Sequence, residues 1–308
     1  MSNCVFCKSE FVKIIQKVNR IEIIELYSEE LKINVSNEFK NFEFFNIVEC
    51  QKCKLLFFNP QLVGSESFYE ELQSLESNYY SLNRPEFDFA LDFIAKDDSV
   101  LEIGSGSAIF AQKLKVNKYI GLEYNDRAIV EAQKKGISLI KDNIKSFVNN
   151  HNISFNVVCS FHVIEHVKNP EEFIKYSIKA LKKGGKVIIA VPCADSYLTK
   201  NVNHVLNIIP HHISRWKIES LKFISKKYGL EIIKIEVDKV NNRSQYFVYK
   251  YSYLINKFLF PKKTIINNSK SYKVIFKIVR KINEIFNIYR WENKKKYYGK
   301  NMMIILEN

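Results

Sequence analysis

The residues best suited to bind a ligand lie in segment 100–108, where an apolar run carries Glu102 and is followed by Gly104 and Gly106. The apolar run predicts a strand, and the residues after the second glycine predict a helix. A strand, a tight glycine turn and a helix form the opening unit of a doubly wound α/β fold. Glycine also lets a ligand approach the bare backbone. We therefore expect this turn to bind a ligand.

The spacing of the two glycines excludes two common nucleotide sites. A dinucleotide site needs a third glycine three residues after the second, and Ile109 stands there. A P-loop is excluded because no Gly-Lys-Ser/Thr follows. What remains is an acid-x-Gly-x-Gly-x-small pattern that ends in Ala108. Because glycine turns also occur as simple loop punctuation, the rest of the chain has to identify the ligand.

Acidic residues also follow the next two predicted strands. Strand 119–123 ends in Glu123, at about the 20-residue spacing at which an acid commonly takes ribose hydroxyls. A carboxylate can accept two hydroxyl donors at once; the alternative is a solvated acid at a strand end. Asp142 follows strand 137–140 in the same way. Since parallel strands end at one edge of a sheet, we expect these carboxylates to line one site.

The loop after strand 156–160 carries Glu165 and His166, and it leads into helix 171–181, a Gly-Gly turn at 184–185 and apolar strand 186–192. Alternation of strands with helices predicts an α/β fold with a parallel sheet. The other elements expected in this fold are helices 85–95, 127–135 and 218–228 and strands 230–237 and 300–307.

This succession of motifs resembles class I S-adenosylmethionine (SAM)-dependent methyltransferases, with segment 100–108 as their motif I and segment 161–170 as the loop after their fourth strand. The resemblance implies a Rossmann-like seven-stranded core and SAM as the methyl donor. It places the methionine part of SAM near Glu102, the ribose at Glu123 and the adenine at Asp142. The cofactor-binding residues expected on this basis are Glu102, Gly104, Ser105, Gly106, Glu123, Tyr124, Asp142, Asn143 and Phe161.

A catalytic base is needed only if the methyl acceptor must lose a proton. His166 is the first candidate, because a histidine titrates near neutral pH, and Glu165 could orient or charge it. His211, with its neighbour His212, is the second choice. The alternative for His166 is a structural hydrogen bond within its loop.

Two Cys-x-x-Cys pairs, Cys4 with Cys7 and Cys50 with Cys53, open the chain. Such pairs are typical of a four-thiolate structural zinc site, although four free thiols or two redox pairs remain alternatives. The long gap between the pairs predicts an insertion, in which 21–26 and 39–48 read as strands. The two other cysteines, Cys159 and Cys193, lie in apolar runs and are expected to be buried core thiols.

The order of the cysteine pairs, an aromatic strand ending at Pro60, the Tyr79-Tyr80 segment and motif I resembles one group of bacterial methyltransferases with an N-terminal zinc-binding domain. That group includes deoxysugar C-methyltransferases and enzymes of surface-polysaccharide clusters. The resemblance implies a small-molecule or glycan acceptor, such as a sugar of nucleotide-sugar metabolism. It makes Tyr79 and Tyr80 candidates near the SAM and substrate pocket, with Tyr80 as the candidate at the acceptor; simple packing of these aromatic rings is the alternative. The extra C-terminal domain of the sugar C-methyltransferases has no counterpart here, so the sequence leaves the methylated atom open.

The net charge of +14 is concentrated in residues 241–308, which carry +12, whereas residues 1–66 carry −1. Apolar residues at helical spacing with lysines opposite predict a basic amphipathic helix over 273–291. Such a helix can pack on the domain as a lid, the favoured interpretation, or contact an acidic membrane surface. A nucleic-acid methyltransferase using the ribbon and the basic tail is an alternative function, and a non-catalytic SAM-binding subunit is another. We expect nucleic acid not to be the partner, because the ribbon itself is slightly acidic.

The chain has no apolar run of the ~18 residues that a membrane span needs and no signal peptide at its start, which predicts a cytoplasmic protein, peripheral at the inner membrane surface if the basic helix binds there. The expected organisation is a zinc-ribbon-like domain at 1–66, a helical connector at 67–97, the SAM-binding core at 98–240, a basic helical insertion or lid at 241–297 and the last core strand at 298–308.

Overall fold

The computed structural model describes residues 3–75, 84–240, 242–286 and 298–308. The chain divides into two compact units, each assembled from three segments. The N-terminal unit comprises Met1–Leu75, Pro192–Ile218 and Val237–Lys300, and the core unit comprises Glu76–Val191, Glu219–Glu236 and Asn301–Asn308. Tyr79 and Tyr80 lie outside the described residues.

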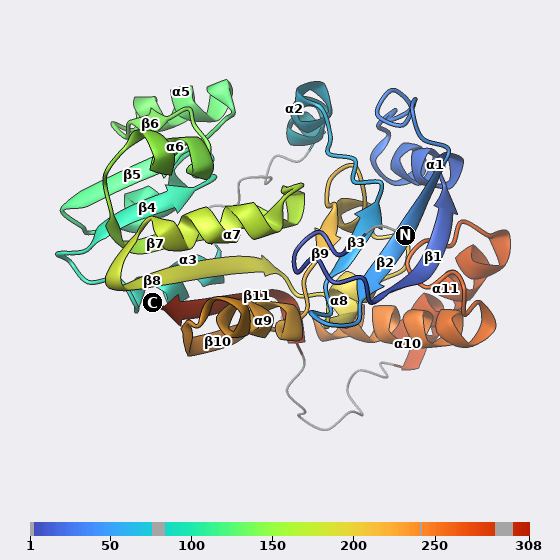
Figure 1. The fold of residues 1–308 in the computed structure, drawn as a ribbon. Helices are drawn as coiled ribbons and strands as arrows, with labels where there is room; N and C mark the ends of the chain where they lie inside the picture. The colour runs from blue at the N-terminus through green and yellow to red at the C-terminus, as the bar shows by residue number, and fades with distance from the viewer. Residues whose placement is uncertain (1–2, 76–83, 241, 287–297) are drawn as a thin grey trace. The chain divides into compact units, whose positions relative to one another are not determined.

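A seven-stranded sheet with the order β10-β11-β8-β7-β4-β5-β6 organises the core unit (Figure 1). Its central strands pair in parallel, β4 with β5 and β7, β5 with β6, and β7 with β8. All five residues of β4 are buried, as expected of a strand covered on both faces. The strands are β4 (Ser99–Ile103), β5 (Lys118–Leu122), β6 (Leu139–Ile140), β7 (Phe155–Phe161), β8 (Leu181–Pro192), β10 (Glu231–Lys239) and β11 (Tyr298–Glu307).

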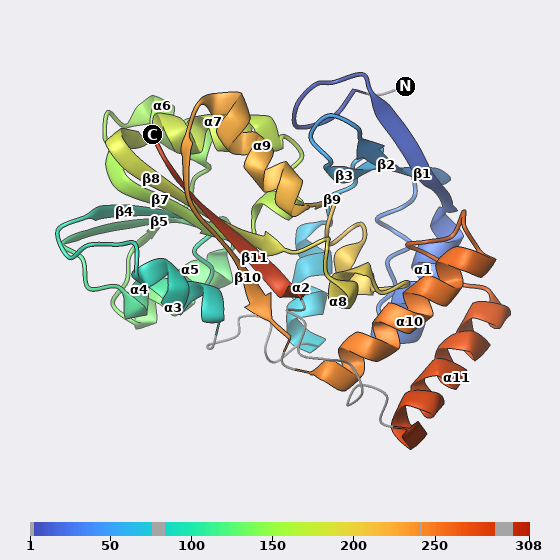
Figure 2. The same cartoon turned by 90° about the horizontal axis from the view of Figure 1, so that it is seen from below.

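Helices cover both faces of this sheet: α3, α4 and α5 lie on one side, and α6, α7 and α9 on the other (Figure 2). Asparagine caps begin three of them, because the side chains of Asn125, Asn143 and Asn169 each accept a backbone N–H of the first turn. The helices are α3 (Pro85–Leu91), α4 (Ile109–Lys113), α5 (Asp126–Lys134), α6 (Ile144–Asn150), α7 (Pro170–Lys179) and α9 (Ile218–Tyr228), with the short 3₁₀ helix η1 at Ile164–His166.

The expected α/β fold with a closing strand at the C-terminus is confirmed, with one local difference at the Gly-Gly turn. The sequence predicts a turn before strand 186–192, but β8 already begins at Leu181. Its pairing with β7 jumps from Leu181 opposite Phe155 to Lys186 opposite Val157, so the residues between them form a bulge. The positive φ of Gly184 shows how glycine accommodates this extra length.

The N-terminal unit contains a four-stranded sheet with the order β1-β2-β3-β9. β1 (Val12–Asn19), β2 (Phe44–Cys50) and β3 (Leu56–Asn59) form an antiparallel meander, and β3 then pairs with β9 (Ser214–Arg215). The pairing of Leu56 with Arg215 therefore brings a late segment of the chain into the N-terminal sheet.

Segment 21–26, which the sequence analysis expects to be a strand, lies instead in helix α1 (Arg20–Leu31), so that expectation is wrong. Its isoleucines favour a strand by propensity. The side chain of Asn19 accepts the N–H of Ile21 and starts a helix, and Ile23, Leu26 and Tyr27 then share one buried face. The second expected strand, 39–48, begins only at Phe44.

The remaining helices of the N-terminal unit are α2 (Glu66–Leu75), α8 (Tyr197–Lys200), η2 (Val205–Asn207), α10 (Arg243–Leu259) and α11 (Lys270–Phe286). α10 and α11 pack against each other, and α10 also packs against α8. Among the described residues, no helix combines the length and the apolar character that crossing a membrane requires.

Candidate active site at the edge of the core sheet

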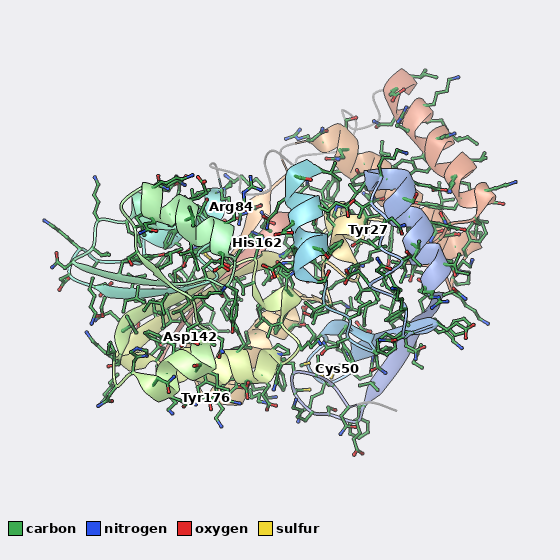
Figure 3. All side chains as sticks on the ribbon, turned by 90° about the horizontal axis from the view of Figure 1, so that it is seen from above. Tyr27, Cys50, Arg84, Asp142, His162 and Tyr176 are labelled. Atoms are coloured by element: carbon green, nitrogen blue, oxygen red, sulfur yellow. The ribbon has the colours of Figure 1, made fainter. Side chains whose placement is uncertain are left out.

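The carboxyl ends of β4, β5, β6 and β7 place their side chains along one edge of the core sheet, because these strands are parallel and in register. Glu123 and His162 directly follow β5 and β7, Asp142 lies two residues after the end of β6, and Glu102 lies within β4. Figure 3 labels Asp142 and His162 in this unit. In open α/β sheets this edge is where ligands bind.

The turn after β4 needs its glycines. Gly104 and Gly106 have φ angles of 72° and 51°, and Ala108, the small residue that ends the pattern, adopts 57°. A Cβ atom on Gly104 would lie 2.5 Å from Cγ2 of Val163, so the loop after β7 packs directly on this turn. The sequence prediction of a tight backbone turn at 104–106 is therefore explained by both dihedral angle and close packing.

Glu102 is buried, with 2% of its surface exposed, and Oε2 accepts a hydrogen bond of 2.6 Å from the hydroxyl of Tyr119. Burial raises the pKa of this carboxyl to about 8, more than the Tyr119 hydrogen bond lowers it. Gly121 leaves room for this contact, because a Cβ there would lie 2.6 Å from the Tyr119 hydroxyl. The buried Glu102 side chain thus links β4 to β5 through the Tyr119 hydroxyl.

Glu123 fixes the backbone of the turn to the end of β5. Its Oε2 accepts the N–H of Gly106 at 2.7 Å, and its Oε1 accepts the N–H groups of Tyr124 at 2.8 Å and Asn125 at 2.9 Å. A carboxylate has about four acceptor sites, so capacity remains for a hydroxyl donor. That Glu123 accepts ribose hydroxyls stays a prediction.

The other residues predicted to bind the cofactor occupy different environments. Asp142 is half-buried and accepts the N–H of Asn143 at 2.7 Å, while Tyr124 is exposed. Ser105 is buried, with its hydroxyl 3.3 Å from the carbonyl oxygen of Glu102. Phe161 packs in the core, with its ring 4.8 Å from that of Phe87 and 4.7 Å from that of Phe110. Phe161 is therefore part of the apolar core of this unit.

A buried network that the sequence analysis did not identify lies at the end of β7. His162 Nε2 is 2.7 Å from Oε1 of Glu86, and its Nδ1 is 3.5 Å from Oε1 of Glu165. Burial alone would lower the pKa of His162, but its contacts with Glu165 and Glu86 raise it to about 9. At neutral pH the ring is therefore an imidazolium between two carboxylates, and it ties α3 to the loop after β7.

The predicted catalytic residues are distributed over both units. Glu165, with 1% of its surface exposed, and the half-buried His166 lie in η1 of the core unit. His211 belongs to the N-terminal unit, where its Nδ1 is 2.9 Å from the carbonyl oxygen of Leu206 and its ring stacks on that of His212. A ring nitrogen facing a carbonyl must carry the proton, so Nε2 of neutral His211 is the basic nitrogen.

The four N-terminal cysteines converge in the N-terminal unit. The Sγ atoms of Cys4 and Cys53 are 3.6 Å apart, those of Cys7 and Cys50 are 3.4 Å apart, and all four lie within 4.8 Å of one another. A tetrahedral zinc thiolate site, with Zn–S bonds of about 2.3 Å, separates its sulfurs by roughly 3.8 Å. The spacing therefore fits one tetrahedral ion.

The two Cys-x-x-Cys turns repeat the same backbone geometry. The N–H groups of Cys7 and Cys53 each lie 3.5 Å from the sulfur three residues earlier. Each turn is followed by a lysine with positive φ, Lys8 at 59° and Lys54 at 60°. Cys159 and Cys193 are buried separately, as the sequence predicts.

Comparison with known proteins identifies the core. The model of a family described as "Methyltransferase domain" matches residues 75–235. The chain is 31% identical over 110 residues to the mitochondrial ubiquinone biosynthesis O-methyltransferase of Dictyostelium discoideum, covering 30% of this chain and 34% of that protein. It is 32% identical over 102 residues to an uncharacterised protein of Methanocaldococcus jannaschii, covering 32% and 47%. The chain thus spans less than half the length of these two curated relatives.

A solved SAM-dependent methyltransferase from Archaeoglobus fulgidus has a similar fold. The superposition has a TM-score of 0.52 at 18% sequence identity and covers 79% of this chain and 100% of the other. At this identity the likeness concerns the fold.

Proposed function

The chain belongs to the methyltransferase family, as a SAM-dependent methyltransferase, and from this premise we propose that it methylates a small-molecule or glycan acceptor at the edge of its core sheet. The observation that carries the proposal is the arrangement of Glu123 and the positive-φ turn 104–108 at the ends of neighbouring parallel strands. The resemblance to zinc-bearing bacterial methyltransferases favours a sugar acceptor of surface-polysaccharide or nucleotide-sugar metabolism.

The carboxylates at this edge are hydrogen-bond acceptors that suit the hydroxyl and amino groups of SAM. Glu123 retains acceptor capacity for ribose hydroxyls, and Asp142 offers an acceptor for the adenine amino group. The resemblance places the methionine part beside the turn, near Glu102, Gly104 and Gly106. Bound SAM supplies an electrophilic methyl group on a sulfonium. The residues of the chain then hold the donor and exclude water, since a methyl transfer depends mainly on positioning.

We assign proton removal from the acceptor to His166, with His211 as the second candidate. His166 follows the buried Glu165 in η1, beside the loop that packs on Gly104. The His162 imidazolium neutralises part of the carboxylate charge at this loop. Tyr80, proposed near the acceptor by resemblance, lies outside the described residues.

We further propose a structural zinc ion on Cys4, Cys7, Cys50 and Cys53 and a cytoplasmic location. The convergence of the four sulfurs supports the zinc site. A site closed by four thiolates leaves no position for a substrate, so zinc here stabilises the fold. The acceptor chemistry of the ubiquinone relative, which is named as an O-methyltransferase, makes a hydroxyl the first acceptor group to test.

The test measures two properties of the full chain. Calorimetry should detect SAM binding by the wild type, and production of S-adenosylhomocysteine should rise with an acceptor from a panel of nucleotide sugars and phenols. Replacing His166 with Asn should abolish turnover while SAM still binds; replacing the exposed His151, which follows α6 at its C-cap, with Asn is the matched control. Absence of SAM binding by the wild type overturns the proposal. Methylation of DNA or RNA, but of no small acceptor, would overturn the acceptor class.

A further inference from the structure

α11 carries a stripe of exposed apolar side chains on one face, in addition to the residues that it buries against its own unit. Val274, Ile278, Ile282 and Ile285 expose 54%, 51%, 40% and 61% of their surface. Their spacing of four, four and three residues places them on one face of the helix. Single exposed apolar residues are common on protein surfaces. An aligned row of exposed branched apolar side chains is unusual and indicates an interaction surface.

The stripe lies beside the face by which α11 is held in its unit. Tyr272, Val279 and Asn283 are buried on that face, and the Asn283 side chain donates a hydrogen bond of 2.8 Å to the Ser244 hydroxyl on α10. α11 packs against α10 through this side. The helix is therefore apolar over a wider arc than its own packing uses.

Basic residues border the exposed stripe. α11 carries five cations and one acid, Lys270, Lys273, Lys277, Arg280, Lys281 and Glu284. Lys273 pairs with Glu29, and Arg280 pairs with Glu284. Within the part of the chain that the structure describes, Lys270, Lys277 and Lys281 have no carboxylate within ion-pair distance. By helical spacing these three lysines stand next to Val274 and Ile278.

The end of α10 adds a second exposed apolar group. Phe258 exposes 85% of its surface, and Leu254, Ile255 and Leu259 are also exposed. Lys257 lies among them, and Lys262 follows in the connection to α11, where the next lysine, Lys263, pairs with Glu22 at 3.7 Å. The helix pair thus combines large apolar side chains with a local excess of positive charge.

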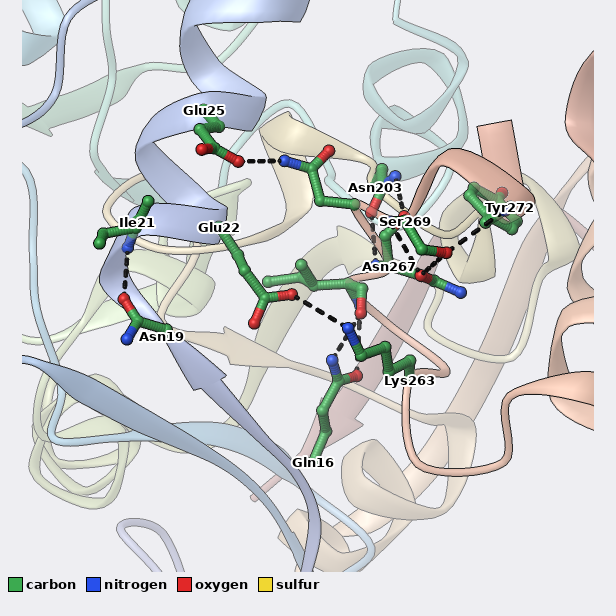
Figure 4. Close-up of polar contacts among 12 residues, drawn as sticks. Gln16, Asn19, Ile21, Glu22, Glu25, Asn203, Lys263, Asn267, Ser269 and Tyr272 are labelled. Carbon is green, nitrogen blue, oxygen red and sulfur yellow. Dashed lines mark hydrogen bonds and ion pairs between the residues drawn. The ribbon is translucent and has the colours of Figure 1, made fainter. Parts of the chain in front are cut away.

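This helix pair is firmly anchored. The side chain of Gln16 on β1 donates to the carbonyl oxygen of Ile266 at 2.6 Å and accepts the N–H groups of Ile265 and Ile266 (Figure 4). Buried Asn267 donates to Asn256 on α10 at 2.7 Å and exchanges two hydrogen bonds with Asn203. These contacts fix the connection between α10 and α11 and hold the stripe in place as a platform.

We propose that the α11 stripe and its lysines dock this unit onto the surface of a bilayer that contains anionic lipids. A helix with an apolar face and lysines beside it lies in the interface, with its apolar side chains at the headgroup boundary and its cations at the phosphates. The lysines beside the stripe complement the negative charge of anionic lipids, and this complementarity favours a bilayer surface as the partner. The proposal goes beyond the methyl transfer itself and would bring the enzyme to an acceptor carried by a lipid, a step that rests on the proposed function.

Vesicle flotation of the full chain tests the docking without any acceptor. We expect binding to vesicles of phosphatidylcholine with a quarter phosphatidylglycerol, little binding to pure phosphatidylcholine, and release by high salt. Replacing both Lys277 and Lys281 with Gln should weaken binding about 30-fold, at about 5-fold per lysine. Replacing both Ile278 and Ile282 with Asn should abolish it. Lys115→Gln and Val130→Asn, exposed sites on the core unit, are the matched controls.

SAM binding, measured on every variant, separates the outcomes. Variants that bind SAM like the wild type but fail to float confirm the docking surface, and loss of SAM binding by the wild type would concern only the proposed function. Equal binding of wild type and Ile278/Ile282 variants, or no binding to anionic vesicles, overturns the docking proposal. A dimer in sedimentation that disappears in those variants, without vesicle binding, overturns it in favour of a second copy of the chain.

Discussion

The carboxylates at the edge of the core sheet have different roles because their neighbours differ. Glu102 is buried under a tyrosine hydroxyl, and burial raises its pKa to about 8. Glu123 accepts the backbone N–H groups of Gly106, Tyr124 and Asn125. The same residue type therefore links β4 to β5 at position 102 and holds the backbone of the turn at position 123.

Replacing Glu123 with Ala should weaken SAM binding by about 1–3 kcal/mol, roughly 5- to 150-fold, because the ribose hydroxyls would lose their acceptor and the N–H of Gly106 would lose its partner. Titration calorimetry measures the change. Asp126→Ala, which removes an exposed acid at the start of α5 that pairs with Lys141, is the control and should leave the affinity unchanged. Equal affinities of the two variants would show that Glu123 does not contact SAM.

The His162 network should make stability fall in alkaline solution. The folded pKa of His162, about 9, lies above the value of 6.5 for a free histidine. Its contribution is therefore fully present below pH 6.5 and is lost as the pH rises through 9. Glu86→Gln removes one carboxylate, so its deficit in the free energy of unfolding should shrink by about 1–2 kcal/mol between pH 7 and pH 10.

Urea unfolding at several pH values measures this deficit, and Asp88→Asn on the exposed side of α3 is the control. A deficit that stays constant with pH would show that His162 is uncharged at neutral pH.

The sequence predicts residues whose role depends on a strand end and fails for those whose role depends on a distant partner. Glu123 and Asp142 follow predicted strands, so their place at the edge could be inferred. His162 meets Glu86 across 76 residues of sequence, and no spacing rule connects them. A histidine directly after a strand, three residues before an acid, was the available signal.

At the scale of elements, glycines inside strands and turns are required by packing. A Cβ on Gly121 in β5 would lie 2.5 Å from both Leu139 Cδ2 and the Ser105 hydroxyl oxygen. Gly121→Ala should therefore destabilise the core unit by about 1–3 kcal/mol through overpacking. Gly136→Ala is the comparison, because nothing lies within 4 Å there and only the positive φ opposes the methyl group, at a cost of about 1 kcal/mol.

Thermal or urea unfolding compares the two variants, and SAM affinity provides a second measurement. Since Gly121 leaves room for the Tyr119 hydroxyl on Glu102, Gly121→Ala should also weaken SAM binding, whereas Gly136→Ala should not. A Gly121→Ala protein as stable as the wild type would contradict this account of β5.

The elements of the core could be predicted because local signals agree with the fold. Helix α9 has the predicted bounds, and α5 and α7 begin one residue before the predicted start. The N-terminal insertion was harder. The isoleucines of α1 favour a strand locally, but the Asn19 cap and the shared buried face of Ile23, Leu26 and Tyr27 stabilise a helix.

At the scale of the whole molecule, neither compact unit is continuous in sequence. The N-terminal unit gathers residues 192–218 and 237–300, and β9 joins its sheet through the pairing of Leu56 with Arg215. Two-residue strands such as β9 carry almost no sequence pattern. The order of strands and helices along the core unit could be inferred from its motifs. That residues 192–218 and 237–300 belong to the N-terminal unit depends on long-range pairing, which no local pattern encodes.

Separate cores predict separate responses to ligands. Zinc on the four cysteines would stabilise the N-terminal unit, because the metal binds only when both Cys-x-x-Cys turns are folded. SAM would stabilise the core unit, by about 2.7 kcal/mol at a concentration of 100 times Kd. Calorimetric unfolding should therefore show two transitions, one lowered by a chelator and the other raised by SAM.

Metal analysis of the purified chain should give one zinc per molecule, because four thiolates complete one tetrahedral site. Cys53→Ser should lose the zinc and lower only the chelator-sensitive transition, and its SAM affinity should match that of the wild type. Cys193→Ala, which removes a buried thiol of the same unit outside the cluster, should keep the zinc and so separates loss of metal from loss of packing. A metal-free wild type with both transitions unchanged would mean that the four cysteines are free thiols and that the N-terminal sheet is stabilised by its apolar core alone.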